Sequence, residues 1–296
     1  MEKSNKSKIE VSIIIVNYNT ALMTINSVDS VIAHTNGVIY EIIIVDNAST
    51  KEDKQLLFNN LADKALIIEN EANKGFGTAN NIGAQKASGE YLFFLNPDTI
   101  VLNNVLQLFL NFYKSSKNKI GAVGCILSDT EQKPNNSYGD FITPTGVIQQ
   151  YLGRDPKKKT DFIKSPKFVD FITGAALMVP CELFFKVGAF DQRFFMYCEE
   201  VDLQKRISNA NYLRVIIPEA SIIHLDGGSY KKKANRSALR RIQQDKSYCI
   251  YIQKHFSLVQ NILFRFLFFV VRLPAVINPH YTVCENINYL RMLISK

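Results

Sequence analysis

The sequence predicts an α/β fold with a mostly parallel, doubly wound sheet and helices on both faces. Strand-like and helix-like segments alternate at intervals of 25–30 residues in the first third of the chain. The strand-like segments are apolar on both faces, as in strands that helices cover on each side. Polar residues follow these segments, notably Asn17, Asp46 and Asp98. Right-handed crossovers bring the carboxyl ends of parallel strands to one edge, so these three residues should meet there.

The first hundred residues supply most of the alternation. Val11–Val16 (VSIIIV) and Glu41–Val45 (EIIIV) are typical of buried strands. The further elements expected here are a helix over 21–33, a helix over 51–62, a strand over 65–68, a glycine-rich start and a helix within 73–88, and a strand over 90–95.

The segment LFFLNPDT (92–99) is the most informative part of the chain. Pro97 has no N–H for a sheet ladder, so strand pairing should end just before it. Asp98 is then left at the carboxyl end of a strand, where open α/β sheets bind ligands and where a carboxylate can hold a divalent cation against a phosphate. An ordinary strand-to-turn junction is the alternative for this segment alone.

The alternation of strand-like and helix-like segments is less regular after Asp98. Residues 128–168 are polar and contain several prolines, which predicts a long loop with a short hairpin, and loops of this length often cover a substrate. The run Lys157-Lys158-Lys159 is more typical of a solvated surface than of a phosphate site. The remaining elements expected before residue 230 are a helix over 102–118, a strand over 120–127, a strand over 168–179, a helix over 181–187, a helix from about 199 to 210 and a strand over 216–224.

Charge and cysteine content narrow the class of protein. The 296-residue chain has a net charge of +8, but residues 1–230 carry 23 Lys+Arg against 25 Asp+Glu, whereas residues 231–296 carry 12 against 2. The basic character therefore belongs to the tail. Five cysteines without a CxxC pair argue against a disulfide framework or a zinc ribbon and fit a reducing cytosol. The polar start MEKSNKSKIE has no secretory pattern, so we expect a cytoplasmic protein.

The tail, residues 231–296, is expected to be helical. Residues 258–277 are dense in Phe, Leu, Ile and Val but include Arg265 and Arg272, and the longest uncharged apolar run is Phe266–Val271. That run is shorter than the roughly 20 residues that span a bilayer. An interfacial helix with snorkelling arginines at the inner face of the cell membrane fits this pattern, and a core or oligomer helix is the alternative. No recognised nucleic-acid fold accompanies the basic tail, so nucleic acid is not an expected partner.

Five segments together resemble the inverting family 2 glycosyltransferases of GT-A fold, close to the rhamnosyltransferase-like branch. They are VSIIIVNYN (11–19), IIIVDNAS (42–49), NKGFGTANNIGAQKASGEYLFFLNPD (73–98), TGAALMVP (173–180) and VGAFDQRFFMYCEEVDLQKRI (187–207). The resemblance implies a GT-A domain over residues 1–230 and leaves the tail outside. It also implies transfer of a sugar such as rhamnose from a dTDP- or UDP-sugar donor to a glycan or lipid-linked glycan acceptor in surface-polysaccharide biosynthesis.

The resemblance further implies donor and metal positions. Asp98 matches the second aspartate of the family's DxD motif, and Asn96 replaces the first with a neutral oxygen ligand. Mg²⁺ or Mn²⁺ is expected at Asp98, with His224 as a further metal ligand, although a lone histidine is often structural. Asn96 then either joins the metal or contacts the nucleotide. The nucleotide contacts implied by the resemblance are Asn17, Tyr18, Asp46, Asn73, Gly75 and Asn80.

Inversion by single displacement requires one general base for the acceptor hydroxyl. Glu199-Glu200 aligns with the family's Glu-Asp pair, whose second member is the usual base, so Glu200 is the candidate and Glu199 the runner-up. Asp202 serves the helix or the acceptor site. Gly174 and Ala175 resemble the strand wall beside the donor and acceptor sugars.

Two other functions fit the sequence less well. A nucleotidyltransferase would have glycine and basic residues in its first loop, and VNYNTALMT (16–24) has neither. A non-catalytic nucleotide-sugar-binding scaffold is suggested by the two departures from the family pattern, at Asn96 and Glu200, although both residues keep usable oxygens.

Overall fold

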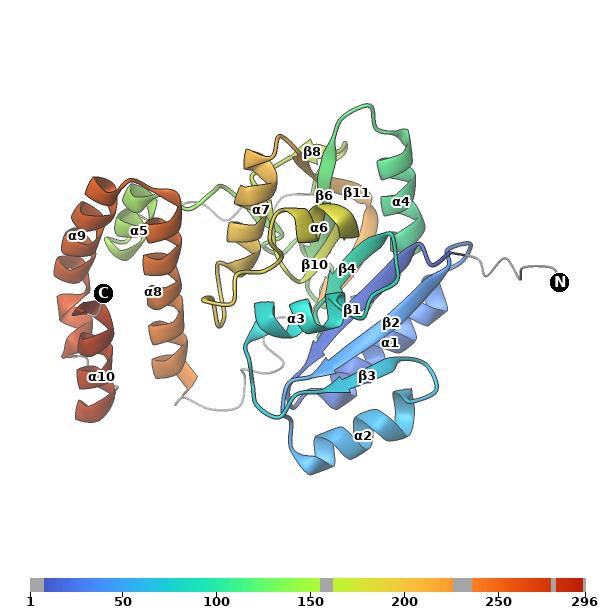
Figure 1. The fold of residues 1–296 in the computed structure, drawn as a ribbon, viewed down its shortest axis with the longest axis horizontal. Helices are drawn as coiled ribbons and strands as arrows, with labels where there is room; N and C mark the ends of the chain where they lie inside the picture. Colours follow the sequence, from blue (N-terminus) through green and yellow to red (C-terminus); the bar gives the residue numbers. More distant parts are fainter. Residues whose placement is uncertain (1–7, 155–161, 226–235, 278–280, 295–296) are drawn as a thin grey trace.

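The computed structural model describes residues 8–154, 162–225, 236–277 and 281–294 of the chain. It has a central twisted sheet with helices on both faces and a group of helices at one side (Figure 1). The strands are β1 (Val11–Asn17), β2 (Tyr40–Asp46), β3 (Leu66–Glu69), β4 (Tyr91–Leu95), β5 (Thr99–Val101), β6 (Ile120–Ser128), β7 (Tyr138–Gly139), β8 (Lys167–Phe168), β9 (Phe171–Ile172), β10 (Ala176–Pro180) and β11 (Leu213–His224).

The helices alternate with these strands and then continue beyond them. They are α1 (Ala21–His34), α2 (Lys51–Leu61), α3 (Phe76–Ala84), α4 (Val105–Ser115), α5 (Pro144–Tyr151), α6 (Cys181–Lys186), α7 (Glu199–Asn209), α8 (Arg236–His255), α9 (Leu258–Val276) and α10 (Val283–Ile294). The predicted α/β class is confirmed, as are the two opening strands and their helices.

The strand order in the main sheet is β3-β2-β1-β4-β10-β6-β11-β5, with β8 paired to β11. Strands β3, β2, β1 and β4 are mutually parallel, as the alternation predicts. Strand β10 is inserted antiparallel between β4 and β6, so the second half of the sheet is mixed. This antiparallel insertion carries the residues just before β10 back to the carboxyl end of β4.

Two hydrophobic clusters cover the two faces of the sheet. Alternate residues of β1 point to opposite sides: Ile13 and Ile15 pack with α1, α2 and α4, and Ile14 packs with α3, α6 and α7. All seven residues of β1 and all nine of β6 are buried. Strands buried on both faces explain the uninterrupted apolar runs in the sequence.

Two elements were missed by the sequence reading. Helix α5 lies inside the segment expected to be a long loop; Pro144 begins this helix, where its missing N–H costs nothing, and Thr143 caps it by accepting from the Gly146 N–H. Strand β5 follows Asp98 immediately and pairs antiparallel with the end of β11. The single strand expected over 168–179 is divided into β8, β9 and β10.

The tail helices pack against the body through a third hydrophobic cluster. Tyr251 of α8, Phe264 of α9 and Tyr289 of α10 share this cluster with Val147 of α5 and Val201 of α7. A buried carboxylate, Asp245 of α8, also ties these helices together. It accepts from the Tyr151 hydroxyl of α5, the Tyr289 hydroxyl of α10 at 2.5 Å and the Arg272 Nε of α9 at 2.9 Å.

Arg272 therefore points inward and does not snorkel toward a membrane surface, contrary to the expectation. The predicted boundary at residue 230, the Lys157–Lys159 run and most of the N-terminal polar segment lie outside the described residues. Helix α9 is the one described helix long and apolar enough to cross a membrane by length and composition, with 19 residues and a mean hydropathy of 1.6. This apolar helix is therefore longer than the uncharged run Phe266–Val271, on which the expectation of a non-spanning helix rests.

Candidate active site

The ends of β1 and β2 form the first part of the site. Asn17 and Asp46 are register partners, and Asn17 Nδ2 donates to Asp46 Oδ1 at 2.9 Å. The predicted meeting of these two residues is therefore confirmed. Both side chains are fully buried, and Asp46 Oδ2 also accepts from the Ser49 N–H at 3.1 Å. These contacts within the protein favour a structural role for Asn17 and Asp46 at the strand ends. Tyr18, next to them, is 44% exposed and is available to contact a nucleobase.

Asp53, which the sequence reading did not single out, completes this part. Its Oδ2 accepts from Asn17 Nδ2 at 2.8 Å and its Oδ1 accepts from the Ala21 N–H at 2.9 Å. The carboxylate therefore joins the end of β1 to the start of α1. Its only sequence signal is its place in the first turn of α2, where an acidic residue is ordinary.

A second loop, before α3, is held by asparagines. Asn47 Nδ2 donates to Asn73 Oδ1 at 2.9 Å, and Asn47 Oδ1 accepts from the Lys74 N–H at 3.0 Å. Asn73 Oδ1 also accepts from the Gly75 N–H at 3.0 Å. Asn80 is nearly buried and donates to the Phe76 carbonyl within α3. Asn47 was missed, because an asparagine after a strand looks like any turn residue.

Gly75 brings this loop against the segment that precedes α7. Its φ is +81°, and an added Cβ would lie 2.2 Å from the Phe195 carbonyl oxygen. The same carbonyl accepts from the Phe76 N–H at 2.9 Å. Only glycine combines this backbone conformation with so close a backbone approach.

The predicted metal residues come together at the end of β4. His224 Nε2 lies 3.2 Å from Asp98 Oδ1 and 3.5 Å from Asn96 Nδ2. Strand β5 explains this meeting, because it pairs Thr99 with His224 in antiparallel register. A carboxylate, an imidazole and an amide are donors that a divalent cation accepts, with the amide oxygen turned inward. Within the described ranges, no group of three or more His, Cys, Asp or Glu side chains is arranged to hold a metal.

The two candidate base residues begin α7. Glu199 is 5% exposed and Glu200 is partly exposed, so Glu200 is the more accessible residue of the two. Tyr197 and Cys198, just before them, have φ of +71° and +66°, a strained backbone that turns the chain sharply into the helix. The Oε2 atoms of both glutamates are buried without a hydrogen-bond partner among the described residues.

Burial raises the pKa of both glutamates, and the neighbouring charge of Glu200 raises the pKa of Glu199 further. Backbone N–H groups at the start of α7 offset part of this increase in the pKa of Glu200. A carboxylate with a raised pKa and an unpartnered oxygen is suited to accept a proton from an alcohol.

Gly174 and Ala175 lie between the metal residues and the glutamates. The Asn96 N–H donates to the Ala175 carbonyl at 2.9 Å, which fixes these residues beside the end of β4. A Cβ on Gly174 would lie 3.6 Å from Glu200 Cβ and 3.4 Å from the Phe76 ring. Residues 96 and 200, remote in sequence, are thus both neighbours of the dipeptide 174–175. The two halves of the predicted site meet at this point.

Asp202 is placed differently from Glu200. Its side chain is fully buried, and both oxygens accept from neighbours: Oδ1 from His255 Nε2 at 2.7 Å and Oδ2 from Arg206 Nη2 at 2.7 Å. Burial raises the pKa of Asp202, but hydrogen bonds from His255 and the charge of Arg206 outweigh it and hold the pKa below its usual value. These contacts favour the helix over the acceptor site as the role of Asp202.

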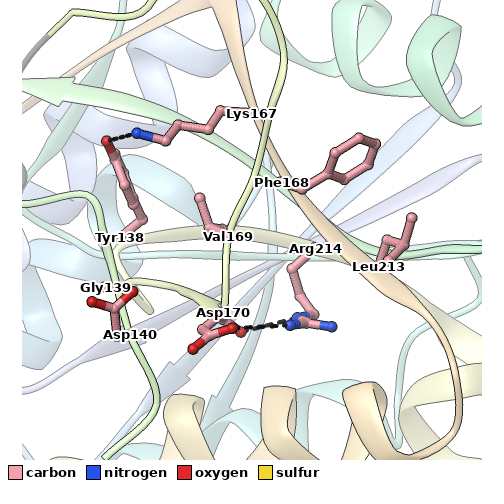
Figure 2. Close-up of a pocket in the computed structure, with 9 residues that line it drawn as sticks. All are labelled: Tyr138, Gly139, Asp140, Lys167, Phe168, Val169, Asp170, Leu213 and Arg214. Atoms are coloured by element: carbon pink, nitrogen blue, oxygen red, sulfur yellow. Dashed lines mark hydrogen bonds and ion pairs between the residues drawn. The ribbon is translucent and has the colours of Figure 1, made fainter.

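A separate pocket of about 250 Å³ lies between β7, β8 and the start of β11 (Figure 2). Lys167 donates to the Tyr138 hydroxyl at 2.9 Å, and Arg214 lies 3.8 Å from Asp170. None of the predicted site residues lines this pocket. Its charged groups already have protein partners, so its volume alone gives no indication of function.

The chain is similar in sequence to known glycosyltransferases. A family model described as "Glycosyl transferase family 2" matches residues 12–179, more than half of the chain. Rhamnosyltransferase WbbL of Escherichia coli is 29% identical over 215 residues, which cover 68% of this chain and 80% of that protein. An uncharacterised glycosyltransferase of Rickettsia typhi is 32% identical over 201 residues, which cover 68% of this chain but only 59% of its own length.

Another relative is the N-acetylglucosaminyl-diphospho-decaprenol L-rhamnosyltransferase of Mycobacterium tuberculosis, 26% identical over 206 residues that cover 62% of this chain and 66% of that protein. Among solved structures, GalNAc-T7 with UDP, GalNAc and Mn²⁺ matches with a TM-score of 0.61 at 19% identity, over 99% of this chain and 55% of that one. The Pyrobaculum calidifontis mannosyltransferase PcManGT, in complex with GDP-Man and Mn²⁺, matches with a TM-score of 0.58 at 15% identity, over 97% and 86%. At these identities the structural matches establish the GT-A fold alone.

Proposed function

Because the chain belongs to glycosyl transferase family 2, we propose that this glycosyltransferase inverts the anomeric centre of the sugar it transfers and uses the residues around Gly174–Ala175 to do so. The observation that carries the proposal is that Ala175 contacts Asn96 while Gly174 faces Glu200. A donor diphosphate beside Asp98 and an acceptor hydroxyl beside Glu200 would then flank the same strand start. An in-line displacement needs this arrangement of leaving group and nucleophile.

The donor is proposed to be a dTDP- or UDP-sugar, with rhamnose as the sugar. Rhamnose is supported by two relatives that are rhamnosyltransferases. Asp98 and His224 would hold Mg²⁺ or Mn²⁺, with Asn96 as a neutral third donor. A divalent cation in this place neutralises the charge that develops on the leaving diphosphate. Tyr18, exposed at the end of β1, would contact the base.

Glu200 is proposed as the general base. It is ionised above its raised pKa, and its unpartnered oxygen can accept the proton of the acceptor hydroxyl as the new glycosidic bond forms. Glu199 is more deeply buried and adjoins Gly77, so it is less accessible to an acceptor. The replacement of the family's aspartate by glutamate extends the carboxylate by one methylene, a reach of about 1.5 Å.

The acceptor is proposed to be a lipid-linked surface-glycan precursor at the inner face of the cell membrane. Helix α9 supports this placement, because its charged Arg272 is paired inside with Asp245 and its outer side is apolar. The exposed large hydrophobic side chains of α9 are Leu258, Val259, Ile262, Leu263, Phe266, Leu267, Val270 and Leu273. We call these residues the outer face of α9. The other side of α9 packs against α5, α8 and α10, so the proposal is surface attachment rather than a spanning helix.

The enzymatic proposal is tested with purified protein and a panel of dTDP-, UDP- and GDP-sugars, with and without Mn²⁺. We expect slow release of nucleoside diphosphate from one donor, dependent on the metal. Glu200→Gln should reduce transfer by about 100-fold or more while donor affinity stays within about two-fold, because it removes the base and keeps the shape. Normal transfer by Glu200→Gln would exclude Glu200 as the base. Donor binding without turnover by the unmodified protein would favour a non-catalytic scaffold.

Attachment is tested by flotation with vesicles that contain phosphatidylglycerol. Phe266→Gln should weaken binding, whereas Phe162→Gln is a matched control, since the two phenylalanines are 65% and 62% exposed and Phe162 lies outside α9. Equal binding by both variants and by the unmodified protein would contradict the role of the outer face. A concentration-dependent dimer that Phe266→Gln dissociates would instead assign this face to an oligomer contact.

A further inference from the structure

Asp202 connects the helix that carries the candidate base to the tail. It lies in the first turn of α7, and its N–H donates to the Cys198 carbonyl at 2.8 Å, next to the left-handed turn before Glu199. Its carboxylate faces the last turn of α8. Lys254 Nζ lies 2.8 Å from Oδ1 and 3.0 Å from Oδ2, in addition to the His255 contact already described.

The same cluster extends to the loop before α7. Lys254 Nζ donates to Asp191 Oδ2 at 2.7 Å, and Arg206 Nη2 donates to the Ala189 carbonyl at 2.7 Å. Two carboxylates, Asp191 and Asp202, thus share the ammonium of Lys254. Loop 187–198 and α7, which follow each other in the sequence, are thus joined to the distant end of α8 by charged hydrogen bonds, which are stronger than neutral ones.

Apolar packing supports the same connection. Phe194, Cys198 and Val201, which surround the glutamate pair in sequence, belong to the hydrophobic cluster that includes Tyr251 and Ile252 of α8. The His255 ring also packs on Tyr251, with ring centroids 4.6 Å apart. Figure 1 shows α8 beside α7, on the side away from the parallel half of the sheet. The turn that orients Glu200 therefore lies between the sheet and the tail.

We propose that Lys254 and His255 are positioning residues for transfer: by holding Asp202 they fix the first turn of α7, and with it the Glu200 carboxyl group. This inference rests on the proposed role of Glu200 as base. Removing one donor from a buried carboxylate displaces the helix start, and a shift of about 1 Å at a reacting group can lower a rate about 100-fold. Donor binding, which uses β1, β2 and β4, should be spared.

The kinetic test compares His255→Leu, His255→Gln and Lys254→Met. His255→Leu and Lys254→Met should each lower kcat by about 10- to 100-fold with KM for the donor within about two-fold. His255→Gln should restore most of the lost kcat, since the glutamine amide can donate where Nε2 does. Arg193→Ala is the matched control: it removes a 56% exposed side chain that pairs with Asp191 in the same cluster, and it keeps Arg206, Lys254 and His255 as donors to Asp202. Its kcat should equal that of the unmodified protein.

Hydrogen–deuterium exchange separates this inference from the proposed function. Amides of residues 194–203 should exchange at least about 10-fold faster in His255→Leu than in Arg193→Ala, while those of β1 and β4 stay unchanged. If no donor is turned over by the unmodified protein, the proposed function fails, and the exchange data still decide whether the tail holds α7. Unchanged exchange, or an equal loss of kcat in His255→Gln and His255→Leu, would overturn the positioning role.

Discussion

The contact between Gly75 and Phe195 provides a stringent test of the candidate site. Gly75→Ala adds one methyl group at a residue with φ of +81°, 2.2 Å from a backbone carbonyl oxygen. With ψ of 170°, Gly75 lies in a backbone region that is essentially confined to glycine, and alanine there costs about 1–3 kcal/mol. Displacing the Phe195 backbone adds about 1–3 kcal/mol, the usual cost of overpacking. We therefore expect the free energy of unfolding to fall by roughly 2–6 kcal/mol.

Gly153→Ala is the matched control for this substitution. Gly153 has a similar φ of +77°, but an added Cβ there meets nothing within 4 Å. This variant should lose only the conformational part, about 1–2 kcal/mol. The difference between the two variants isolates the cost of the close approach between the α3 loop and the segment before α7.

The free energy of unfolding of both variants is measured by urea denaturation, monitored by circular dichroism. Donor turnover is measured in parallel. Gly75→Ala should also lower turnover, because displacement of Phe195 moves the start of α7 with its glutamates. Equal losses of stability in Gly75→Ala and Gly153→Ala would show that the two segments are not in tight contact. The loop before α3 would then not be coupled to the start of α7, which carries Glu200.

Three further predictions concern charge. Burial raises the pKa of Glu200, so the folded state binds more protons than the unfolded state between the usual glutamate pKa, about 4.3, and the raised value. Stability should fall as pH rises through that window. Glu200→Gln should reduce this slope in urea titrations at several pH values, leaving the part that buried Glu199 contributes, and should remove the acid limb of the transfer rate. Asn96→Asp adds a carboxylate at the proposed metal site and should tighten Mn²⁺ binding by about 10-fold or more, as measured by calorimetry. Asp98→Asn removes a carboxylate and should weaken binding by a similar factor. Unaltered affinity in both variants would place the metal elsewhere. Asp245→Asn should lower the free energy of unfolding by about 3–5 kcal/mol, because it leaves Arg272 buried beside a neutral group. The control Lys246→Ala, at an exposed residue, should change it by no more than about 0.5 kcal/mol, as measured by thermal unfolding.

The parallel half of the sheet was predictable because its signals are local. Strands buried on both faces leave continuous apolar runs, and parallel strands need crossovers of similar length. Pro97 ended β4 as expected, which left Asp98 at the strand end. Helix α5 forms where the prolines of residues 128–168 predict a loop, because Pro144 occupies the first position of the helix, where a proline is favourable.

The sequence predicted the residues proposed for the site and the meeting of Asn17 with Asp46, but it did not reveal the strand pairing that brings His224 to Asp98. Nothing local to His224 indicates that β5 will pair with the end of β11 and bring the imidazole to Asp98. Asp53 and Asn47 were missed because each looks like an ordinary capping or turn residue until its contact across the sheet edge is seen.

The sequence by itself determined the α/β class, the strand ends that carry polar residues and the pair of glutamates at a helix start, because strand periodicity and helix-start preferences act over a few neighbouring residues. The tertiary structure alone decided which of these groups are neighbours. Insertion of β10 antiparallel beside β4 sets Gly174 against Glu200, and the last turn of α8 supplies the partners of Asp202. Such contacts join segments far apart in the chain, and their energies depend on burial and distance, which no local pattern encodes.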